Sequence, residues 1–408
     1  MEQKILLNLL QHAINGKEWE EEYKIDGYKV YSLARQQGIA VLIFPVLKMV
    51  YEKGFLEMKQ EDFKSIEDET MQMCMRYTKK QFAVYSILEK MKSTGIDYVV
   101  MKGDTLAYLY AYPEYRISSD TDILIDKEKE EECCSFLKKN GAQVTDRAED
   151  NNERAAVHKN FGTIEIHVDY NTKTVSEVWY ENINVQEEKT REVLIFDLFK
   201  VECMGYTDVA INLFLHFIKH YIGGIAHLRM LADLMVFLDC EHNNIDFVRF
   251  NKVLEKLKYK TVFKCMEYIA VTYLGLKSFM TDEKIKDLAV EFISDIFVCG
   301  EYNAKNVDIG CYDYFSQKKY NKINSGSYVE YKKEIISKKI YRIIIPHKLT
   351  MEKKYSILRR HKFLLPFAYV YRWMDVLLFR NRRKKKQENS VDKYKVKREN
   401  LIDNMQMI

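Results

Sequence analysis

The segment RISSDTDILI, residues 116–125, places two aspartates one residue apart where an apolar run begins. Side chains alternate between the two faces of an extended strand, so Asp120 and Asp122 would share a face, about 6 to 7 Å apart along the backbone. Two like charges at that separation repel each other unless a proton, a basic side chain or a cation lies between them. A divalent metal ion is one such cation, and the neighbouring segments indicate whether it fits.

The segments around this aspartate pair predict an α/β core. Short β-branched runs predict strands, and longer runs with three- and four-residue spacing predict helices. The expected strands lie at 96–104, 120–126 and 162–170, and the expected helices at 105–112 and 127–141. This order of strand, helix, strand, helix and strand is typical of an α/β core of about 100 residues.

The first predicted strand ends in a turn that would suit a phosphate group. Lys102, Gly103 and Asp104 close the strand, and a helix is expected to begin directly after them. Free backbone N–H groups and the helix dipole favour an anion at such a helix start. Asp104 or Thr105 would cap this helix.

The third predicted strand, GTIEIHVDY, carries acidic side chains on one face. Strict alternation gives that face the residues Thr163, Glu165, His167 and Asp169. On a strand next to the aspartate pair, Glu165 would be a third carboxylate, and Asp169 is the alternative. Three carboxylates near a phosphate-binding turn suit one or two Mg²⁺ ions for phosphoryl or nucleotidyl transfer, and the third could take the proton from an attacking hydroxyl. Arg116 is a candidate to stabilise the developing phosphate charge.

These motifs resemble the core of the nucleotidyltransferases of the DNA polymerase β superfamily, above all a bacterial branch with the pattern KG, R, D-x-D and E-x-H. The matching positions are Lys102, Gly103, Arg116, Asp120, Asp122, Glu165 and His167. The resemblance implies Mg²⁺-dependent transfer of a nucleoside monophosphate from a nucleoside triphosphate (NTP). It implies that Asp120, Asp122 and Glu165 are catalytic metal ligands, and that Lys102, Gly103, Arg116 and His167 bind the nucleotide. The family usually has Gly-Ser where this chain has Gly103 and Asp104.

The expected fold class is α+β, with a small mixed β-sheet nucleotidyltransferase core between helical N- and C-terminal segments. Apolar residues at helical spacing recur on both sides of the core, and no internal repeat is visible. The predicted regions are an N-terminal helical region at 1–92, the nucleotidyltransferase core at 93–200, a helical domain at 201–300 and a C-terminal extension at 301–408.

Composition agrees with a folded, helix-rich protein. Of 408 residues, 47% are hydrophobic and 30% are charged, and the chain has only four prolines and fifteen glycines. The formal net charge is +4, and RNRRKKK at 380–386 contributes six positive charges, so the rest of the chain is slightly acidic. Composition therefore does not indicate a nucleic-acid-binding protein.

Cysteine usage and the first residues favour a cytoplasmic location. The eight cysteines include no C-x-x-C pair, so we expect reduced, mostly buried thiols. The N-terminus lacks the charged, apolar and small-residue pattern of a signal peptide.

Other proteins that use a D-x-D motif fit this chain less well. In phosphatases of the haloacid dehalogenase type the apolar strand precedes the acids, whereas here the apolar run ILI follows them. A metal-dependent glycosyltransferase fails on the same order. An EF-hand needs an oxygen ligand where Leu124 stands and glycine where Ile125 stands, so it is excluded.

The helical region holds two further pairs of polar residues four positions apart. His216 and His220 could bind zinc, but HFIKH lacks the glutamate of hydrolytic motifs, so structural or substrate-facing histidines are favoured. Arg229 and Asp233 are expected to form an ion pair on one helix. The segment containing both pairs is similar to an H…R-h-h-h-D helix pair of the resembling family, where h is hydrophobic.

An apolar segment and a basic tail end the chain. FLLPFAYVYRWMDVLLF, at 363–379, is too short and too polar to span a bilayer. With the basic residues behind it, the segment 363–386 would suit a helix on an anionic membrane surface, peripheral to the inner membrane. The alternative is a packed core helix followed by a solvated tail.

The predicted function is therefore Mg²⁺-dependent transfer of a nucleoside monophosphate from NTP to the hydroxyl of a small-molecule or macromolecular acceptor. The sequence identifies neither the acceptor nor the base of the nucleotide. The alternative is a non-catalytic relative that keeps the nucleotidyltransferase fold as a binding or regulatory protein.

Overall fold

The computed structural model describes residues 1–145, 153–168, 188–195, 198–311, 314, 367–369 and 385–407. The chain divides into two compact units, one formed by Met1–Gly310 with Leu401–Met407 and the other by the segment Cys311–Asn400. The first unit contains the whole predicted core. The finer boundaries expected from the sequence, at residues 92, 200 and 300, stay predictions.

The helices of the described residues have the following bounds. The α-helices are α1 (Glu2–Asn15), α2 (Gly27–Gln36), α3 (Phe44–Glu52), α4 (Gln60–Lys92), α5 (Glu130–Lys139), α7 (Tyr206–Ile222), α8 (Leu228–Cys240), α9 (Phe247–Leu257), α10 (Lys260–Leu274), α11 (Lys286–Ala304) and α16 (Lys385–Asn404). Short 3₁₀ helices are η1 (Gly103–Leu109), η2 (Pro113–Tyr115), η3 (Lys127–Lys129), η4 (His242–Asn244) and η5 (Glu283–Ile285).

The strands form a small sheet and a large one. Two short strands, β1 (Ile25–Asp26) and β2 (Leu56–Glu57), pair in parallel among the N-terminal helices. The large sheet has the order β5-β6-β7-β4-β3-β9-β8. Its strands are β3 (Val99–Val100), β4 (Asp120–Leu124), β5 (Gln143–Val144), β6 (Glu153–His158), β7 (Gly162–His167), β8 (Arg191–Ile195) and β9 (Phe199–Cys203).

Parallel pairing of β4 with β7 sets the register of the core. Asp120 lies opposite Thr163, and Asp122 lies opposite Glu165. Strand β3 runs antiparallel to β4 and parallel to β9, so the sheet is mixed. The predicted α+β class with a mixed sheet between helical segments is confirmed.

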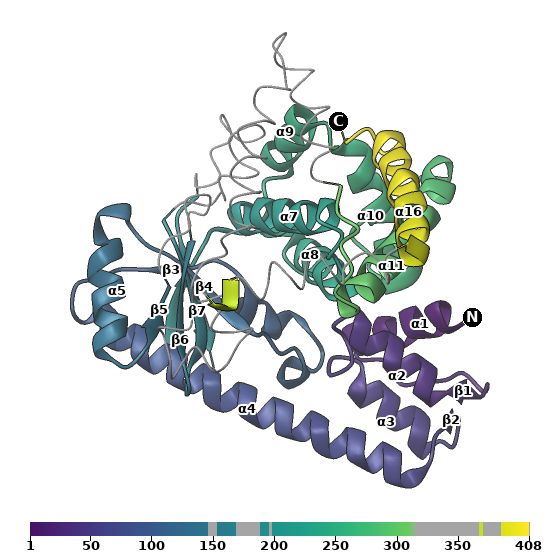
Figure 1. Cartoon of the computed structure of the whole chain (residues 1–408), viewed down its shortest axis with the longest axis horizontal. Helices are drawn as coiled ribbons and strands as arrows, with labels where there is room; N and C mark the ends of the chain where they lie inside the picture. The colour runs from purple at the N-terminus through teal and green to yellow at the C-terminus, as the bar shows by residue number, and fades with distance from the viewer. Residues whose placement is uncertain are drawn as a thin grey trace. The chain divides into compact units, whose positions relative to one another are not determined.

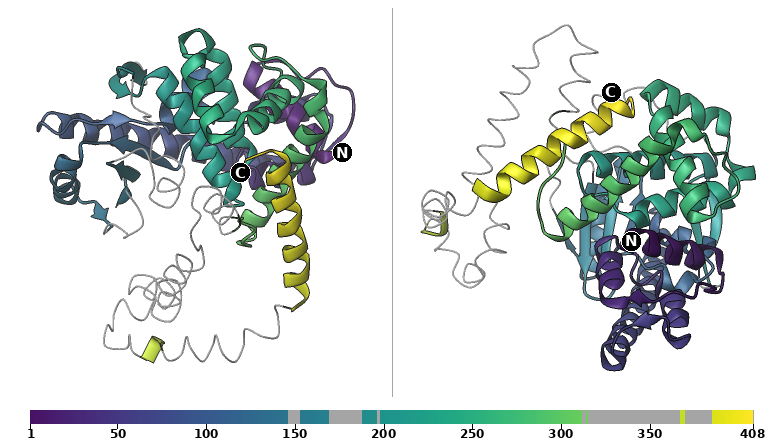
Figure 2. Two further views of the ribbon diagram at one scale, coloured as in Figure 1. Left: turned by 90° about the horizontal axis from the view of Figure 1, so that it is seen from above. Right: turned by 90° about the vertical axis from the view of Figure 1, so that its right-hand side faces the viewer.

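One face of this sheet carries the hydrophobic core. The end of α4 and the buried side of α5 pack against apolar side chains of the central strands, such as Ile123, Ile164 and Ile166. Figure 1 shows α4, a helix of 33 residues, running from the N-terminal helices to the sheet. The teal helices α7 and α8 lie next to one another in Figures 1 and 2, and they pack together.

Most of the predicted core elements are present, but one is wrong. Strands at 120–126 and 162–170 correspond to β4 and β7, and the helix at 127–141 corresponds to α5. The strand at 96–104 is reduced to the two residues of β3. The α-helix predicted at 105–112 is instead the 3₁₀ helix η1, and no side-chain cap hydrogen bond precedes it.

The Asp104 side chain explains why it caps no helix. It is buried beneath the turn, where it accepts hydrogen bonds from Tyr77 (2.7 Å), Tyr85 (3.1 Å) and Thr121 (3.0 Å). Burial raises the pKa of this carboxyl group above its ordinary value. Asp104 therefore joins α4, η1 and β4 on the sheet face that carries the core.

A second buried junction joins the N-terminal helices to the helical region. The Gln37 side chain accepts a hydrogen bond from the Leu228 N–H at 3.2 Å and donates one to the Phe297 carbonyl at 2.9 Å. Gly38 follows with a φ of +67°, and a Cβ there would lie 3.3 Å from the His227 ring. This junction holds the start of α8, which lines the site described below.

The C-terminal segment gives little further information. Among the described residues, no helix combines the length and the apolar character needed to cross a membrane. Almost all of 363–386 lies outside the described residues, so membrane-surface contact stays a prediction. The sequence analysis did not predict helix α16.

Removing a hydroxyl group that donates a hydrogen bond to Asp104 should destabilise the fold. We expect Y77F and Y85F each to lower the free energy of unfolding by about 1 to 3 kcal/mol, because a buried carboxyl group loses a donor. Urea denaturation measures this change. Y98F is the matched control, since the Tyr98 ring is buried but its hydroxyl makes no hydrogen bond within the described residues. Equal losses in all three variants would contradict the role given to Asp104.

Burial of His227 should make stability depend on pH. Desolvation, followed by the charge of Arg229, lowers the pKa of His227 to about 4. Below its ordinary pKa of about 6.5 the unfolded chain therefore binds a proton that the folded chain does not. The contribution of neutral His227 to stability is therefore complete above about pH 6.5 and is lost as the pH falls toward 4.

We expect wild type to lose about 1 to 2 kcal/mol more than H227Q when the pH falls from 8 to 5. Urea denaturation at both pH values gives this difference, and any packing cost of the substitution appears equally at both. Parallel losses in the two proteins would show that His227 is not the group responsible.

Candidate functional site

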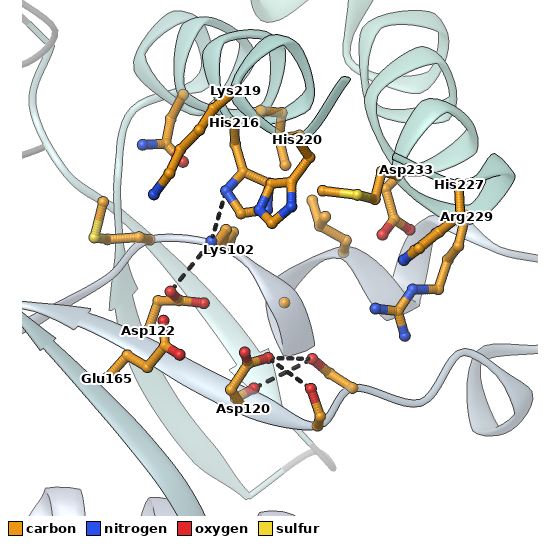
Figure 3. A pocket seen from close by; sticks show the side chains of 18 of the residues that line it. Lys102, Asp120, Asp122, Glu165, His216, Lys219, His220, His227, Arg229 and Asp233 are labelled. Carbon is orange, nitrogen blue, oxygen red and sulfur yellow. Dashed lines mark hydrogen bonds and ion pairs between the residues drawn. The ribbon is translucent and has the colours of Figure 1, made fainter. Parts of the chain in front are cut away.

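A cleft of about 400 Å³ opens on the sheet face opposite the core. Its floor is made by the turn after β3 and by strands β4 and β7, and helices α7 and α8 form its other side (Figure 3). All seven residues predicted for the site line this cleft: Lys102, Gly103, Arg116, Asp120, Asp122, Glu165 and His167. A cavity of this size is in the range of ligand sites.

Asp122 is the most enclosed carboxylate of the cleft. Its Oδ1 lies 3.2 Å from Lys102 Nζ and 3.1 Å from His167 Nε2. Burial opposes the charged form, but Lys102 and then His167 bring the pKa of Asp122 well below its ordinary value. Asp122 is therefore an ionised carboxylate at neutral pH.

Glu165 and His167 stand beside Asp122. One ligand atom from each of these three residues lies within 4.8 Å of the others. Glu165 is half-buried, and its Oε2 lies 3.9 Å from His167 Nε2. Among the described residues, this is the group of three acidic, histidine or cysteine side chains that could share an ion.

Asp120 lies in the cleft but outside this group of three. Its Oδ1 accepts hydrogen bonds from the hydroxyls of Ser118 (3.3 Å) and Ser119 (3.2 Å). The two serines hold the Asp120 carboxylate at the mouth of β4. Asp169, the alternative third carboxylate, lies outside the described residues.

Gly103 makes the turn between β3 and η1. Its φ of +81° is in the left-handed region that favours glycine. Its carbonyl accepts a hydrogen bond from Arg116 Nη1 at 2.9 Å. Since η1 is a 3₁₀ helix, the α-helix dipole expected at this turn is not present, whereas the glycine and the neighbouring Lys102 remain.

Arg116 is buried and paired with Asp233 of α8. Its Nη2 lies 2.6 Å from Asp233 Oδ2, and its Nε donates to Oδ1 at 3.1 Å. Tyr110 donates a further hydrogen bond to Asp233 at 2.7 Å. Burial opposes the charge on Arg116, but Asp233 raises the arginine pKa above its ordinary value. The expected ion pair of Asp233 with Arg229 is replaced by this pair with Arg116.

Arg229 is thereby left to line the cleft. Its Nη1 donates to the Ile117 carbonyl at 3.1 Å, and its Nε is buried without a hydrogen bond to the described residues. Burial, and then the charge of Arg116, lowers the pKa of Arg229 below its ordinary value. Figure 3 shows its guanidinium group pointing into the cleft, on the side of Asp120.

Helix α7 contributes His216, Lys219 and His220 to the same cleft. Lys102 Nζ lies 3.1 Å from His216 Nδ1. Burial, and then the charge of Lys102, lowers the pKa of His216 well below its ordinary value and that of His220 to about 3. Within the described residues neither histidine belongs to a group of three ligands that could share an ion, and their structural or substrate-facing role stays a prediction.

Sequence analysis did not include α7 and α8 residues among its site residues. The signal that could have found them is HFIKHYIGGIAHLR, which concentrates histidines and basic residues within an otherwise apolar region. Such a concentration is unusual in buried helices, because charged side chains are rarely buried without a partner.

Solved structures with some likeness to this chain include three nucleotidyltransferases or related proteins. The lincosamide antibiotic adenylyltransferase LnuA, bound to lincomycin, is 17% identical with a TM-score of 0.29, covering 38% of this chain and 93% of its own. The antibiotic-resistance factor ANT(2'')-Ia is 10% identical with a TM-score of 0.33, covering 46% and 99%. An antigenic nucleotidyltransferase-like protein from Paracoccidioides brasiliensis is 14% identical with a TM-score of 0.30, covering 51% and 96%.

Comparison with protein families is more informative. A search among curated protein sequences finds no match. The sequence profile of a family described as uncharacterised nucleotidyltransferases matches residues 23–275, more than half of the chain. The matched range includes the large sheet, helices α7 and α8, and the acidic and basic residues described above for the cleft. The chain therefore belongs to this family of uncharacterised nucleotidyltransferases.

Proposed function

We propose that this protein transfers a nucleoside monophosphate from NTP to the hydroxyl of an acceptor, with Mg²⁺ as the metal ion. The observation that carries the proposal is the close approach of Asp122, Glu165 and His167 at one side of a cleft whose other side is basic. Membership of the family supports the reaction class.

The donor atoms in the cleft fit a divalent cation. Asp122 and Glu165 offer hard carboxylate oxygens, and His167 offers a ring nitrogen. Asp120 adds a carboxylate two residues before Asp122, on the same face of β4. Oxygen ligands of this kind suit Mg²⁺, and we assign Asp120, Asp122 and Glu165 to hold it. A bound Mg²⁺ would neutralise the triphosphate and polarise the phosphoryl group under attack.

The opposite side of the cleft suits the negative charge of a triphosphate. Lys219 and Arg229 line it, and Lys102 reaches toward it from the turn after β3. The Arg229 guanidinium has a buried nitrogen that is not hydrogen-bonded to the described residues, so a phosphate oxygen could accept from it. Gly103 lets the backbone approach a phosphate closely, and His167 is a further contact.

The sequence suggested that Arg116 stabilises the charge on the phosphate directly, whereas this proposal gives it a supporting role. Its guanidinium holds Asp233 on one side and the Gly103 carbonyl on the other. It would therefore fix the turn that receives the phosphates and add positive charge at the rear of the cleft. A direct bond to phosphate would require a rearrangement of the pair with Asp233.

Glu165 is the best-placed group to accept the proton of the attacking hydroxyl. It is half-buried at the cleft surface, whereas Asp122 is enclosed by Lys102 and His167. A carboxylate that reaches both the ion and the acceptor can act as a general base. The acceptor is a small molecule or a macromolecule with a hydroxyl group, and its identity is open.

The alternative of a non-catalytic relative rests on two features, the choice of the third carboxylate and the presence of Asp104 where the superfamily usually has a serine hydroxyl near the phosphates. An acidic side chain directed at the phosphates would also repel them. Asp104 is instead buried on the opposite face of the sheet by Tyr77, Tyr85 and Thr121, and it does not line the cleft. Asp104 therefore adds no negative charge at the surface that would receive the phosphates, which supports the catalytic proposal.

Replacing Asp122 should abolish the stabilisation of the protein that Mg²⁺ and NTP produce together. We expect NTP with Mg²⁺ to raise the melting temperature of wild type, because a ligand of the folded state stabilises it. The D122N variant should bind Mg²⁺ and NTP at least about 100-fold more weakly and show no such shift. Labelling of a cell extract by α-labelled NTPs should be lost in parallel.

The matched control is D126N. Asp126 follows the same strand but is exposed and lies outside the cleft, so this variant should behave as wild type. A nucleotide shift that persists in D122N, or that does not require Mg²⁺, would contradict the proposed metal site.

Arg229 should contribute to nucleotide binding through charge. We expect R229M to raise the dissociation constant for NTP with Mg²⁺ about tenfold, as for the loss of a hydrogen bond between charged groups. Isothermal titration calorimetry measures this constant. The difference between the proteins should shrink as NaCl is added, because salt screens the attraction.

R76M is the control for Arg229, since Arg76 is an exposed arginine of α4 outside the cleft. It removes the same charge from the protein without changing the site. An equal loss of affinity in R76M would indicate a general effect of net charge, and no loss in R229M would exclude Arg229 from the nucleotide site.

A further inference from the structure

Lys102 occupies an unusual position for a residue expected to bind phosphate. Its Nζ contacts Asp122 Oδ1 at 3.2 Å, on the carboxylate that the proposed function assigns to the metal ion. The exposed fractions of the two side chains are only 16% and 2%, so the pair is largely shielded from water. Figure 3 shows the ammonium group between Asp122 and the α7 helix rather than directed into open space.

His216 holds the other side of this ammonium group. The distance from Lys102 Nζ to His216 Nδ1 is 3.1 Å. An ammonium group can only donate hydrogen bonds, so His216 Nδ1 must accept. The low pKa of His216 agrees with a neutral ring in this role. Lys102 thus has one partner among the metal-binding acids and one on the basic side of the cleft.

The charges around Lys102 resemble those around a bound cation. Burial lowers the lysine pKa, but the carboxylates of Asp122, Glu165 and Asp120 offset this and raise it above its ordinary value. These are the same three acids that we assign to Mg²⁺. A divalent cation among them would repel an ammonium group in contact with Asp122, because like charges at short range are strongly unfavourable where water is excluded.

We propose that Lys102 is an internal counter-ion that occupies the metal site until metal and nucleotide bind together. The lysine neutralises Asp122 in the free protein, and metal alone must compete with it for that carboxylate. When NTP binds, its phosphate oxygens accept hydrogen bonds from the displaced ammonium group. The hydrogen bond to His216 keeps that group in the cleft. Metal and nucleotide therefore bind cooperatively, and this inference rests on the proposed function.

The proposal gives K102M two effects of opposite sign. Without the competing ammonium group, metal alone should bind more tightly. Without a donor for the phosphates, NTP should bind more weakly in the presence of metal. A residue that only supports the fold would weaken both, so the opposite signs distinguish the two roles.

The test measures Mn²⁺ binding to the full-length protein without nucleotide, from the electron paramagnetic resonance signal of free Mn²⁺. We expect K102M to lower the dissociation constant for Mn²⁺ at least about fivefold, within the usual range of coupling between sites. K102R keeps the positive charge and should stay close to wild type. The double variant K102M/D122N should lose the gain. K102Q replaces K102M if thermal unfolding shows that K102M does not fold.

K80M is the matched control for charge alone. The carboxylates of Asp104, Asp120 and Asp122 also act on Lys80, but its Nζ donates to the Ser118 carbonyl at 3.3 Å instead of contacting Asp122. Removing it takes one positive charge from the same neighbourhood. Equal tightening in K80M and K102M would overturn the proposal, because the effect would not require contact with Asp122.

Failure of the inference can be told from failure of the proposed function. If Mn²⁺ binding depends on Asp122 but K102M leaves it unchanged or weaker, Lys102 is no counter-ion and the metal site stands. If Mn²⁺ binding does not depend on Asp122 in any of these proteins, even with a non-hydrolysable NTP analogue, both proposals are overturned. Tighter Mn²⁺ binding with weaker binding of that analogue in K102M would support the inference.

Discussion

The parallel register between β4 and β7 is the constraint on which the site depends. It places Asp122 opposite Glu165, while Ile123 lies opposite Ile166. The isoleucine face is buried against α4 and α5, so a shift of one residue would expose that apolar face and bury the acids. The hydrophobic effect thus fixes the position of Asp122 and Glu165, although neither of them takes part in the core.

Three buried acids around this sheet have partners that serve different purposes. Asp104 receives three hydroxyl groups and joins α4 to the turn. Asp233 receives Arg116 and joins α8 to the same turn. Asp122 receives Lys102 and His167 within the cleft. The first two carboxylates join elements of the fold, whereas the third belongs to the group of cleft residues that we assign to the metal ion.

The cleft is polarised because its two sides come from different parts of the chain. Strands β4 and β7 supply the carboxylates, and α7 and α8 supply lysine, arginine and histidine side chains. A polyphosphate with a bound cation has the complementary arrangement of charge. Such preorganised charge is the largest contribution to catalysis in many enzymes that transfer phosphoryl groups. The helical region is therefore as important to the proposed chemistry as the sheet that carries the recognisable motif.

Sequence alone determined the alternation that brings Asp120, Asp122, Glu165 and His167 to one face, because the two-residue period of a strand is a local property. It also indicated the mixed α+β class and the family resemblance. It could not show the direction of the Asp104 side chain, and it predicted an α-helix where η1 forms, since local propensity competes there with three buried hydroxyl groups. Tertiary structure alone decided that Arg116 pairs with Asp233 across 117 positions and that Lys102 lies between Asp122 and His216. Contacts between such distant residues have no periodic signature, because they depend on how whole elements pack.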